Sequence, residues 1–595
     1  MSARRYRDQI PNYDKFPEVA LKGMDGQAWS GWDALAPALE KAIHNRKGQN
    51  EAAKTATVLT VDCYSAINDR EVLGELKARL KPALVVEVQE ALLPEAALND
   101  LLSRDLTDDR VFGVMTNFRI GDFFDRTKLA CLRDSVEAAQ GLVLVYGIGA
   151  SLVHPGDVLV YADMARWEIQ LRYRRKEACN WGATNYEEDF LRKYKRSFFI
   201  EWRVLDRHKR QLFTRMDFVL DTNRPGDPAM ATGTAHREAL RQAVRRPFRL
   251  VPFFDPGPWG GQWMKEICQL DPGQANYAWC FDCVPEENSL YLNIGGVKLE
   301  IPSINLVFLQ PVELLGDKVH ARFGAEFPIR FDFLDTMDGG NLSLQVHPLT
   351  EYIQEEFGMH YTQDESYYLL DAQEDATVFL GVKTGIDARN MLADLQAAQA
   401  GMQPFPDRDY INQWPAKKHD HFLIPAGTVH CSGKNAMVLE ISATPYIFTF
   451  KLWDWDRLGL DGRPRPVHLE HGAKNIQWHR NTEWVQKNLV NRIEPSACGP
   501  GWWEERTGLH EREFIETRRT WFDGPVTHHT HGSVNVLNLV EGSAVIVESP
   551  SGAFEPFEVH YAETFIVPAA VGTYVIRPAP GVSGKCGTIK AYVRA

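Results

Sequence analysis

The sequence predicts a multidomain protein in which an α/β domain with a parallel sheet precedes two mainly β domains. Three observations lead to this fold class. The chain has 595 residues, which is too long for one hydrophobic core. Residues 51–240 alternate apolar, strand-like runs with stretches at helical spacing, and residues after about 250 carry short alternating strands between Gly, Pro, Asn and Asp. The first pattern is typical of parallel sheets, and the second of antiparallel sandwiches or barrels.

Composition and charge exclude several classes of protein. The hydrophobic fraction of 44% and the charged fraction of 24% are those of ordinary globular proteins. A net charge of −13 argues against a nucleic-acid partner, which would need a basic face. The apolar run at 141–153 is too short to cross a bilayer, and the first residues lack the apolar core of a signal peptide. We therefore expect a cytoplasmic protein with no membrane partner.

Cysteine usage supports the same compartment. Nine scattered cysteines fit a reducing environment better than a disulfide framework. Cys280 and Cys283 form a lone C-x-x-C pair. Without a second pair or a nearby histidine, we interpret them as structural thiols rather than as a metal or redox site.

The front half begins with an N-terminal extension, residues 1–50, and continues with the α/β domain, 51–240. Near-continuous apolar runs predict its strands at 57–64, 83–88, 110–115 and 141–147. This layout resembles a P-loop kinase domain of the uridine-kinase kind, but the motif G-x-x-x-x-G-K-[ST] is absent from the sequence. The resemblance implies a degenerate domain that senses a ligand or serves assembly and does not hydrolyse ATP. An unrelated α/β domain is the alternative.

Three polar residues of this domain lie at or just beyond predicted strand ends: Asp62, Arg119 and Asp163. Ligands of open α/β sheets bind outside the carboxyl ends of the strands. These residues are therefore candidate ligand contacts, although polar residues also occur at strand ends by chance.

A candidate metal site lies in the stretch from 339 to 383. Gln345 and His347 stand two residues apart in an alternating run, so both side chains point to the same face of a strand. Glu365 opens a second strand-like run, and His430 follows a turn much later. Two imidazoles, a carboxylate and an amide oxygen suit Zn²⁺ or another divalent metal ion. A lone histidine on a strand is more often a core or surface residue, so the set as a whole carries the prediction.

These residues belong to a longer series of short sequence motifs: PWGG (258–261), FPIRFDFLD, LSLQVHP, DESYYLL, FLIPAGTVH and KLWDWDR. In this order and rough spacing, the chain resembles the type I phosphomannose isomerases over about 250–595. The resemblance implies two cupin (jelly-roll) domains, a catalytic one at 250–500 and a C-terminal one at 508–595. It also implies a metal-dependent aldose–ketose isomerase that interconverts mannose 6-phosphate and fructose 6-phosphate through an enediol. The helical stretch 388–399 is a small insertion.

The resemblance further implies catalytic and substrate-binding roles. Glu440 matches an active-site acid, and Lys451 stands where the family has an arginine. Asp332 and Gln363 replace two family lysines, and the loss of cations weakens a phosphate site. A different sugar, phosphorylated or not, is therefore a serious candidate. The candidate substrate-binding residues are Arg330, Asp332, Gln363, Lys383 and Arg457.

The C-terminal cupin carries His529 and His531 at the spacing that cupins use for metal. Thr573 and Tyr574 stand where a further histidine is expected, and Asn535 or Asn538 where a glutamate is expected. We therefore predict a structural role for this domain. Two alternatives to an isomerase remain: a non-catalytic regulatory protein that binds a sugar or sugar phosphate, and a structural metal in a cupin that serves another reaction.

Overall fold

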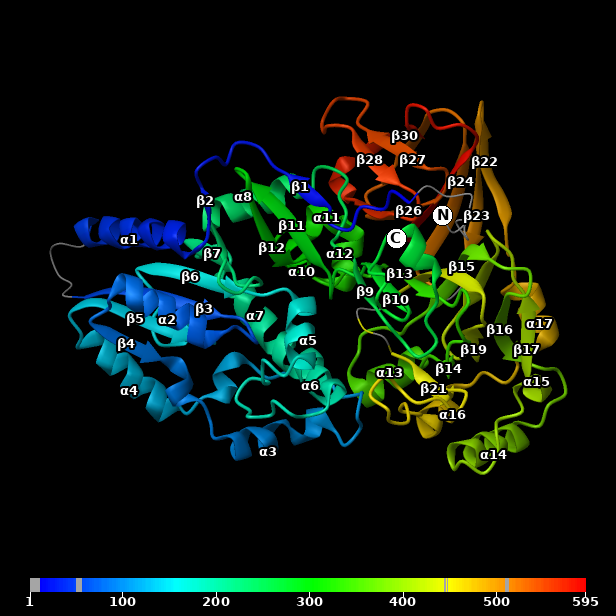
Figure 1. The fold of residues 1–595 in the computed structure, drawn as a ribbon, viewed down its shortest axis with the longest axis horizontal. Coiled ribbons are helices and arrows are strands. Elements are labelled where there is room, and N and C mark those ends of the chain that lie inside the picture. Colours follow the sequence, from blue (N-terminus) through cyan, green and yellow to red (C-terminus); the bar gives the residue numbers. More distant parts are fainter. Residues whose placement is uncertain (1–10, 50–55, 444–445, 447, 509–512, 595) are drawn as a thin grey trace. The chain divides into compact units, whose positions relative to one another are not determined.

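The computed structural model (Figure 1) describes residues 11–49, 56–443, 446, 448–508 and 513–594. The chain forms two compact units, each built from segments distant in sequence. The first, here called the α/β unit, comprises Glu18–Ala243 and Ser289–Leu309. The second, the β unit, comprises Val244–Asn288, Gln310–Ala595 and the N-terminal part of the chain up to Pro17.

A seven-stranded sheet organises the α/β unit. Five neighbouring strands are parallel, and they are, in spatial order, β7 (Phe218–Asp221), β6 (Val158–Asp163), β3 (Ala56–Cys63), β5 (Gly141–Gly147) and β4 (Leu84–Glu87). Two antiparallel strands extend the sheet, β8 (Ala229–Thr232) and β2 (Ala28–Ser30). The central strand β3 is buried along nearly its whole length, which explains its unbroken apolar sequence.

Helices α1 (Trp32–Gln49) and α2 (Asp69–Leu80) pack on one face of this sheet. Leu35 and Leu39 of α1 and Leu76 of α2 share one core cluster with β3, β5, β6 and β7. A second, three-stranded sheet contains β1 (Glu18–Ala20), β11 (Ser289–Ile294) and β12 (Val297–Pro302). The remaining helices of the unit are α3 (Glu95–Leu106), α4 (Arg126–Glu137), α5 (Arg166–Arg174), α6 (Phe190–Arg196), α7 (Trp202–Leu212), α8 (Gly233–Ala243) and α10 (Ile304–Leu309).

One predicted strand of this unit is wrong. Residues 110–115 form an irregular segment, because other groups accept hydrogen bonds from their backbone N–H groups. The Asp109 carboxylate accepts from Val111 and Phe112, and the Asp105 carbonyl accepts from Val114. These bonds leave the segment unable to join a sheet ladder.

The domain boundaries expected from the sequence stay a prediction, and the compact units differ from them in two places. Residues 18–49 supply β1, β2 and α1 to the α/β unit instead of forming an extension. Residues 289–309 return to the same unit with β11, β12 and α10. The expected boundary at residue 51 lies outside the described residues.

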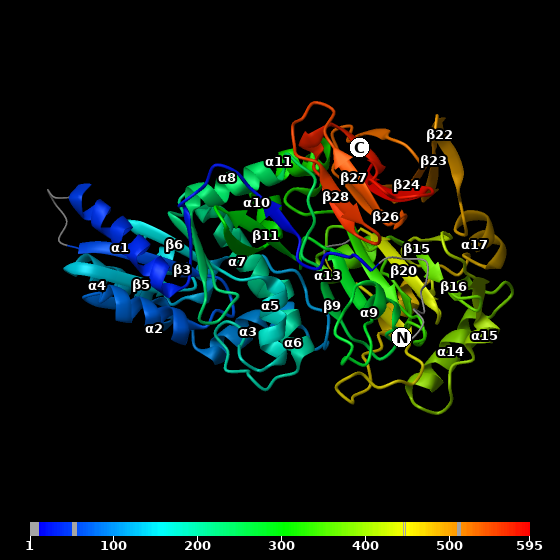
Figure 2. The same ribbon diagram turned by 45° about the horizontal axis from the view of Figure 1, so that its top comes forward.

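The β unit contains two pairs of antiparallel sheets (Figures 1 and 2). The six-stranded sheet of the first pair is β18 (His421–Ile424), β15 (Glu365–Ala372), β20 (Ala436–Ser442), β13 (Arg330–Asp335), β10 (Trp279–Cys283) and β9 (Phe253–Asp255). Its five-stranded partner is β17 (Ile411–Pro415), β16 (Thr377–Val382), β19 (His430–Ser432), β14 (Leu344–Val346) and β21 (Phe450–Trp453). The helix predicted over 388–399 is confirmed as α14 (Ala388–Gln399).

The second pair forms a sandwich around one core. Its six-stranded sheet is β22 (Glu494–Gly499), β23 (Trp502–Gly508), β24 (Ile515–Phe522), β31 (Cys586–Val593), β26 (Asn535–Glu541) and β29 (Thr564–Val567). The four-stranded sheet is β25 (Val526–His529), β30 (Thr573–Pro578), β27 (Ala544–Glu548) and β28 (Phe557–His560). Leu537 and Phe565 from the larger sheet pack with Val545 and Ile576 from the smaller one, as expected for sheets that face each other. The sandwich begins earlier than residue 508, because β22 and β23 belong to it.

The short helices of the β unit lie between its strands: α9 (Trp263–Ile267), α11 (Pro311–Leu315), α12 (Asp317–Phe323), α13 (Thr350–Phe357), α15 (Asp407–Tyr410), α16 (Leu469–Asn475) and α17 (Thr482–Asn488).

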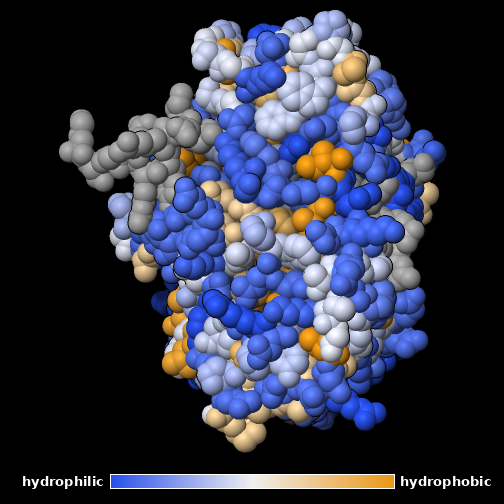
Figure 3. All heavy atoms as spheres, turned by 90° about the vertical axis from the view of Figure 1, so that its right-hand side faces the viewer, coloured by the Kyte–Doolittle hydropathy of each residue, from blue (hydrophilic) through white to orange (hydrophobic). Residues whose placement is uncertain are grey.

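Hydrophilic residues dominate the face drawn in Figure 3, where hydrophobic ones gather only in small groups on its described part. Among the described helices, none combines the length and apolarity needed to cross a membrane. Cys280 and Cys283 both belong to β10, and both are buried free thiols.

A buried carboxyl at the end of β13 predicts a pH-dependent stability. The Asp335 oxygens accept hydrogen bonds from the backbone N–H groups of Met264 (2.8 Å) and Met337 (3.0 Å). Burial nevertheless raises the pKa of Asp335 from 3.8 to about 7. Because the folded state holds this proton more tightly than the unfolded chain, the stabilisation is complete below about pH 4 and is lost as the pH rises through about 7.

We expect the unfolding temperature to fall between about pH 5 and about pH 8, and Asp335→Asn to flatten that fall. The effect corresponds to a few kcal/mol at most, on the order of 1.4 kcal/mol for each pKa unit. The variant is less stable at pH 5, because its amide nitrogen faces a backbone donor. Thermal unfolding followed by circular dichroism measures both slopes. Parallel slopes in the two proteins would show that Asp335 does not carry the effect.

Candidate metal centre

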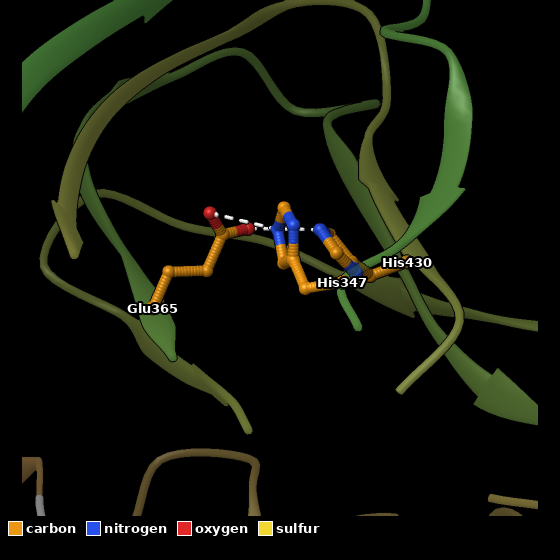
Figure 4. Close-up of side chains that lie close together, drawn as sticks. All are labelled: His347, Glu365 and His430. Atoms are coloured by element: carbon orange, nitrogen blue, oxygen red, sulfur yellow. Dashed lines mark ion pairs between the residues drawn. The ribbon is translucent and has the colours of Figure 1, made fainter. Parts of the chain in front are cut away.

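His347, Glu365 and His430 form the one group of three or more His, Cys, Asp or Glu side chains among the described residues that is arranged so that it could hold a metal ion, and it is called here the metal-ligating group. Their ligand atoms all lie within 4.8 Å of one another, and all three side chains are buried. Figure 4 shows the Glu365 carboxylate pointing at both imidazoles. The nearest carboxylate oxygens lie 3.1 Å from His347 Nε2 and 2.8 Å from His430 Nε2.

The strand register brings Gln345 to the same place. Gln345 on β14 pairs directly with His430 on β19 and with Lys451 on β21. Directly opposed residues share one face of a sheet, so these three side chains form a row beside His347. The amide nitrogen of Gln345 lies 3.2 Å from His430 Nε2. A half-turn of the amide exchanges its nitrogen and oxygen and would present the oxygen as a ligand.

Backbone carbonyls fix which nitrogen of each imidazole is available. His347 Nδ1 lies 2.8 Å from the Phe448 carbonyl, and His430 Nδ1 lies 2.8 Å from the Thr428 carbonyl. A carbonyl only accepts, so each Nδ1 carries the hydrogen and donates it. Each ring therefore turns Nε2 toward the Glu365 carboxylate. Carbonyl-anchored Nδ1 and inward Nε2 are the arrangement found in metal-binding histidines.

The electrostatics of the centre fit a cation. Burial opposes ionisation of Glu365, but the charges and hydrogen bonds of His347 and His430 outweigh it and hold its pKa well below the usual range. When neither Nε2 carries a proton, two inward lone pairs and a carboxylate repel one another unless another positive charge lies between them. A divalent metal ion supplies that charge, and the N/O donor set suits zinc or a similar ion. The residues present therefore fit the expected metal.

A row of polar side chains on the facing sheet continues the site. Asp332 on β13, Glu440 on β20 and Tyr367 on β15 are in register, and Glu365 lies two residues before Tyr367 on the same face. Burial, Asp332 and Glu365 raise the pKa of Glu440 well above its usual range. Burial raises the pKa of Asp332 to about 6, with Arg330 opposing the shift and Glu365 adding to it. Several acidic groups are thus held close to the metal-ligating atoms.

The structure brings most of the predicted site residues together. Arg330 forms an ion pair with Asp332 at 3.3 Å. The Gln363 amide donates to Glu365 at 3.0 Å and to Glu440 at 3.3 Å. Lys451 is half-buried beside Gln345. These contacts place the predicted catalytic residues Glu440 and Lys451 on opposite sheets of one site.

Lys383 and Arg457 lie elsewhere. Lys383 is exposed just beyond β16, and its ammonium donates to the Arg408 carbonyl. Arg457 donates to the Asn341 carbonyl at 2.6 Å and forms an ion pair with Asp454 at 2.5 Å. Arg408 belongs to helix α15 and Asn341 to a loop, and the structure does not bring Lys383 or Arg457 to the metal-ligating group.

Tyr367 is a site residue that the sequence analysis missed. Its ring centroid lies 5.8 Å from that of His430. Its hydroxyl is buried and has no hydrogen-bond partner among the described residues. The available signal was its spacing, because Tyr367 follows Glu365 by two residues and shares its face of β15.

The second histidine pair does not assemble a comparable group. His529 and His531 are exposed, and their ring centroids lie 4.6 Å apart. His529 Nδ1 accepts the backbone N–H of His531 at 2.7 Å. The Tyr574 hydroxyl donates to Asn535 at 3.0 Å, so those positions satisfy each other. No further described His, Cys, Asp or Glu joins the pair in a metal-ligating group.

Comparisons with known proteins give one family model and several relatives. Residues 31–245 match a family model described as "Domain of unknown function (DUF8485)". The chain is similar to "Mannose-6-phosphate isomerase" of Streptococcus mutans, 30% identical over 217 residues, which are 36% of this chain and 62% of that protein. It is also similar to "Mannose-6-phosphate isomerase ManA" of Bacillus subtilis, 27% identical over 26% of this chain and 45% of that protein. The chain thus matches about half to three fifths of the length of these relatives.

Among solved structures, the mannose 6-phosphate isomerase of Bacillus subtilis aligns with a TM-score of 0.48 and 18% identity, over 58% of this chain and 99% of that chain.

Proposed function

We propose that the first pair of sheets in the β unit is a metal-dependent aldose–ketose isomerase. The observation that carries this proposal is the convergence of Gln345, His347, Glu365 and His430 beside the buried carboxyl group of Glu440. The similarity to proteins named mannose-6-phosphate isomerase supports it. Mannose 6-phosphate and fructose 6-phosphate are the default substrate pair, and a cupin fold is the proposed scaffold.

In this mechanism Gln345, His347, Glu365 and His430 would hold the metal ion. When bound, a divalent ion at this position polarises the carbonyl of the sugar and stabilises negative charge on its oxygen. Glu440 carries the proton between C1 and C2, removing it from one carbon and returning it to the other. The Gln363 amide orients Glu440 through its 3.3 Å hydrogen bond.

Two further groups orient the sugar. The free hydroxyl of Tyr367 is available to a sugar oxygen, since it has no described partner. Lys451 lies beside Gln345 on the five-stranded sheet. In this mechanism its ammonium group binds a hydroxyl or phosphate group of the sugar. The binding of both ends of the substrate holds the C1–C2 edge near Glu440.

Turnover by the metal-loaded chain on a panel of phosphorylated and free aldoses tests the proposal. We expect interconversion of at least one aldose–ketose pair, abolished by a chelator and restored by added zinc. Binding of a sugar without turnover would favour a regulatory protein that keeps the scaffold. Bound metal without either sugar binding or turnover would favour a structural metal that serves another reaction.

The charge of the site predicts an altered preference among sugars. Asp332 and Glu440 are buried side by side, and Arg330 is already paired with Asp332. A carboxylate near a phosphate costs about 1–4 kcal/mol for each unit of phosphate charge at distances near 4 Å, depending on the local dielectric. We expect the parent to use mannose 6-phosphate poorly relative to mannose, and Asp332→Asn to raise the relative efficiency for the phosphate by about tenfold or more.

The comparison of kcat/KM for mannose and mannose 6-phosphate in both proteins measures this preference. Asp375→Asn, which changes an exposed aspartate on a turn of the same unit, is the matched control and should change neither value. A parent that prefers the phosphate by several orders of magnitude, with no gain in Asp332→Asn, rules out the charge argument.

For the α/β unit we propose a domain without phosphoryl transfer, and the kinase resemblance stays a hypothesis. The backbone N–H groups of Gly149 and Ser151, in the glycine-rich turn after β5, donate to Asp62 at 3.1 and 2.9 Å. Phosphate-binding turns need such N–H groups free for the ligand. The carboxylate of Asp62 therefore occupies the place that a phosphate would take.

A further inference from the structure

The α/β unit holds a cavity of about 620 Å³ along one face of α7. Val204, Arg207, His208 and Gln211 line it, and their spacing of three and four residues places them on one side of a helix. Arg119, just before the turn 120–123, and Arg210 complete its charged lining. Of the described lining residues none is acidic, so every charge that the cavity receives from its walls is positive.

The three guanidinium groups are not neutralised within the cavity. Burial and the charges of Arg203 and Arg119 lower the pKa of Arg207, and Asp206 offsets this only in part. One terminal nitrogen of Arg207 donates to the carbonyls of Thr116 (3.1 Å) and Phe118 (2.6 Å). Its buried Nε has no partner among the described residues. An anion in the cavity would reduce the repulsion between the arginines and would accept hydrogen bonds from their N–H groups.

The cavity lies where the fold favours ligand binding. His208 Nε2 lies 2.9 Å from Asp62 near the end of β3, and Lys209 binds Asp163 at the end of β6 at 2.8 Å. Helix α7 thus runs along the carboxyl edge of two adjacent parallel strands. The connections from β3 and β6 leave toward opposite sides of the sheet, to β4 and β7. This is a switch point, at which open α/β sheets form a ligand crevice.

Of the three ligand contacts predicted for this edge, Arg119 lines the cavity. Asp62 and Asp163 bind protein groups instead. Their role is to hold α7 in place through His208 and Lys209.

We propose that this cavity binds a small molecule in which a phosphate group is joined to an apolar or aromatic part. The arginines supply the phosphate site, because one guanidinium group can donate two parallel hydrogen bonds to two phosphate oxygens. The apolar wall, formed by Ile120, Val204, Phe213, Phe308 and Leu309, suits a flat apolar ring. The volume of the cavity is within the usual range for ligand sites. The proposal concerns a different unit and does not depend on the isomerase activity.

Isothermal titration calorimetry on the full chain tests the site, with ADP, GDP, UDP and pyridoxal phosphate as probes and adenosine as the unphosphorylated control. We expect one of the phosphorylated probes to bind and adenosine to bind at least tenfold more weakly. Arg119→Gln and Arg210→Gln change exposed residues, so the fold should survive, and each should weaken binding by about tenfold or more.

Arg192→Gln is the matched control, since Arg192 is an exposed arginine of α6 outside the cavity. It should bind the probe as the parent does. The proposal is wrong if none of the phosphorylated probes binds, or if the Arg119→Gln/Arg210→Gln double variant binds as tightly as the parent.

Discussion

His347→Ala and His430→Ala are each expected to lose the bound divalent ion, from about one per chain to near zero. Each substitution removes one inward Nε2 from a set of four candidate ligands, and a four-ligand site has no spare partner. The loss should be all or none, because the remaining side chains are anchored by the Phe448 and Thr428 carbonyls and by their own strands. Metal analysis of the purified variants by mass spectrometry measures it.

His529→Ala is the matched control for this prediction. It removes an exposed histidine of the second sandwich, which joins no metal-ligating group among the described residues, and should leave the metal content unchanged. Full occupancy in both His347→Ala and His430→Ala would mean that the metal is held by other residues.

Glu440→Gln is expected to lower kcat by about 10²–10⁴-fold while the metal remains bound. The amide has the shape of the carboxyl group and can still accept the Gln363 hydrogen bond, but it cannot take a proton from carbon. Glu440 lies in the middle of β20 among in-register neighbours, so the fold should be preserved. Steady-state kinetics with the best sugar of the panel measures the loss.

Glu374→Gln provides the control, because Glu374 is exposed on a turn of the same unit. Its kinetics should match those of the parent. If Glu440→Gln kept its kcat within a few-fold of the parent, another group would have to carry the proton.

The sequence predicted the parts of the fold that depend on local periodicity. The near-continuous apolar runs became β3, β4 and β5 because both faces of that sheet are covered. The run at 110–115 has the same composition but lacks free backbone donors, which Asp109 and Asp105 accept. The return of residues 289–309 to the α/β unit is a long-range contact that no local pattern announces. Asn305, for example, donates to Asp163 at 2.8 Å across 142 positions.

At the candidate site, strand alternation was enough to pair Gln345 with His347, and the family resemblance strengthened the choice of Glu365 and His430. It could not show where long side chains point. Arg457 binds Asp454 and the Asn341 carbonyl, and Lys383 binds the Arg408 carbonyl in helix α15. The cationic face of α7 also escaped notice, since arginines at helical spacing usually face solvent. Only the structure shows that they surround a cavity.

The central claim is that the metal-ligating group and Glu440 together move a proton between adjacent sugar carbons. Incorporation of solvent deuterium at C1 or C2 tests it most directly. The zinc-loaded chain is incubated in D₂O with mannose 6-phosphate and with mannose, and the sugars are followed by NMR. We predict deuterium at these carbons in at least one sugar with the parent, and none with Glu440→Gln or His430→Ala. A metal-loaded parent that leaves both carbons free of deuterium in every aldose of the panel and forms no ketose would contradict the account.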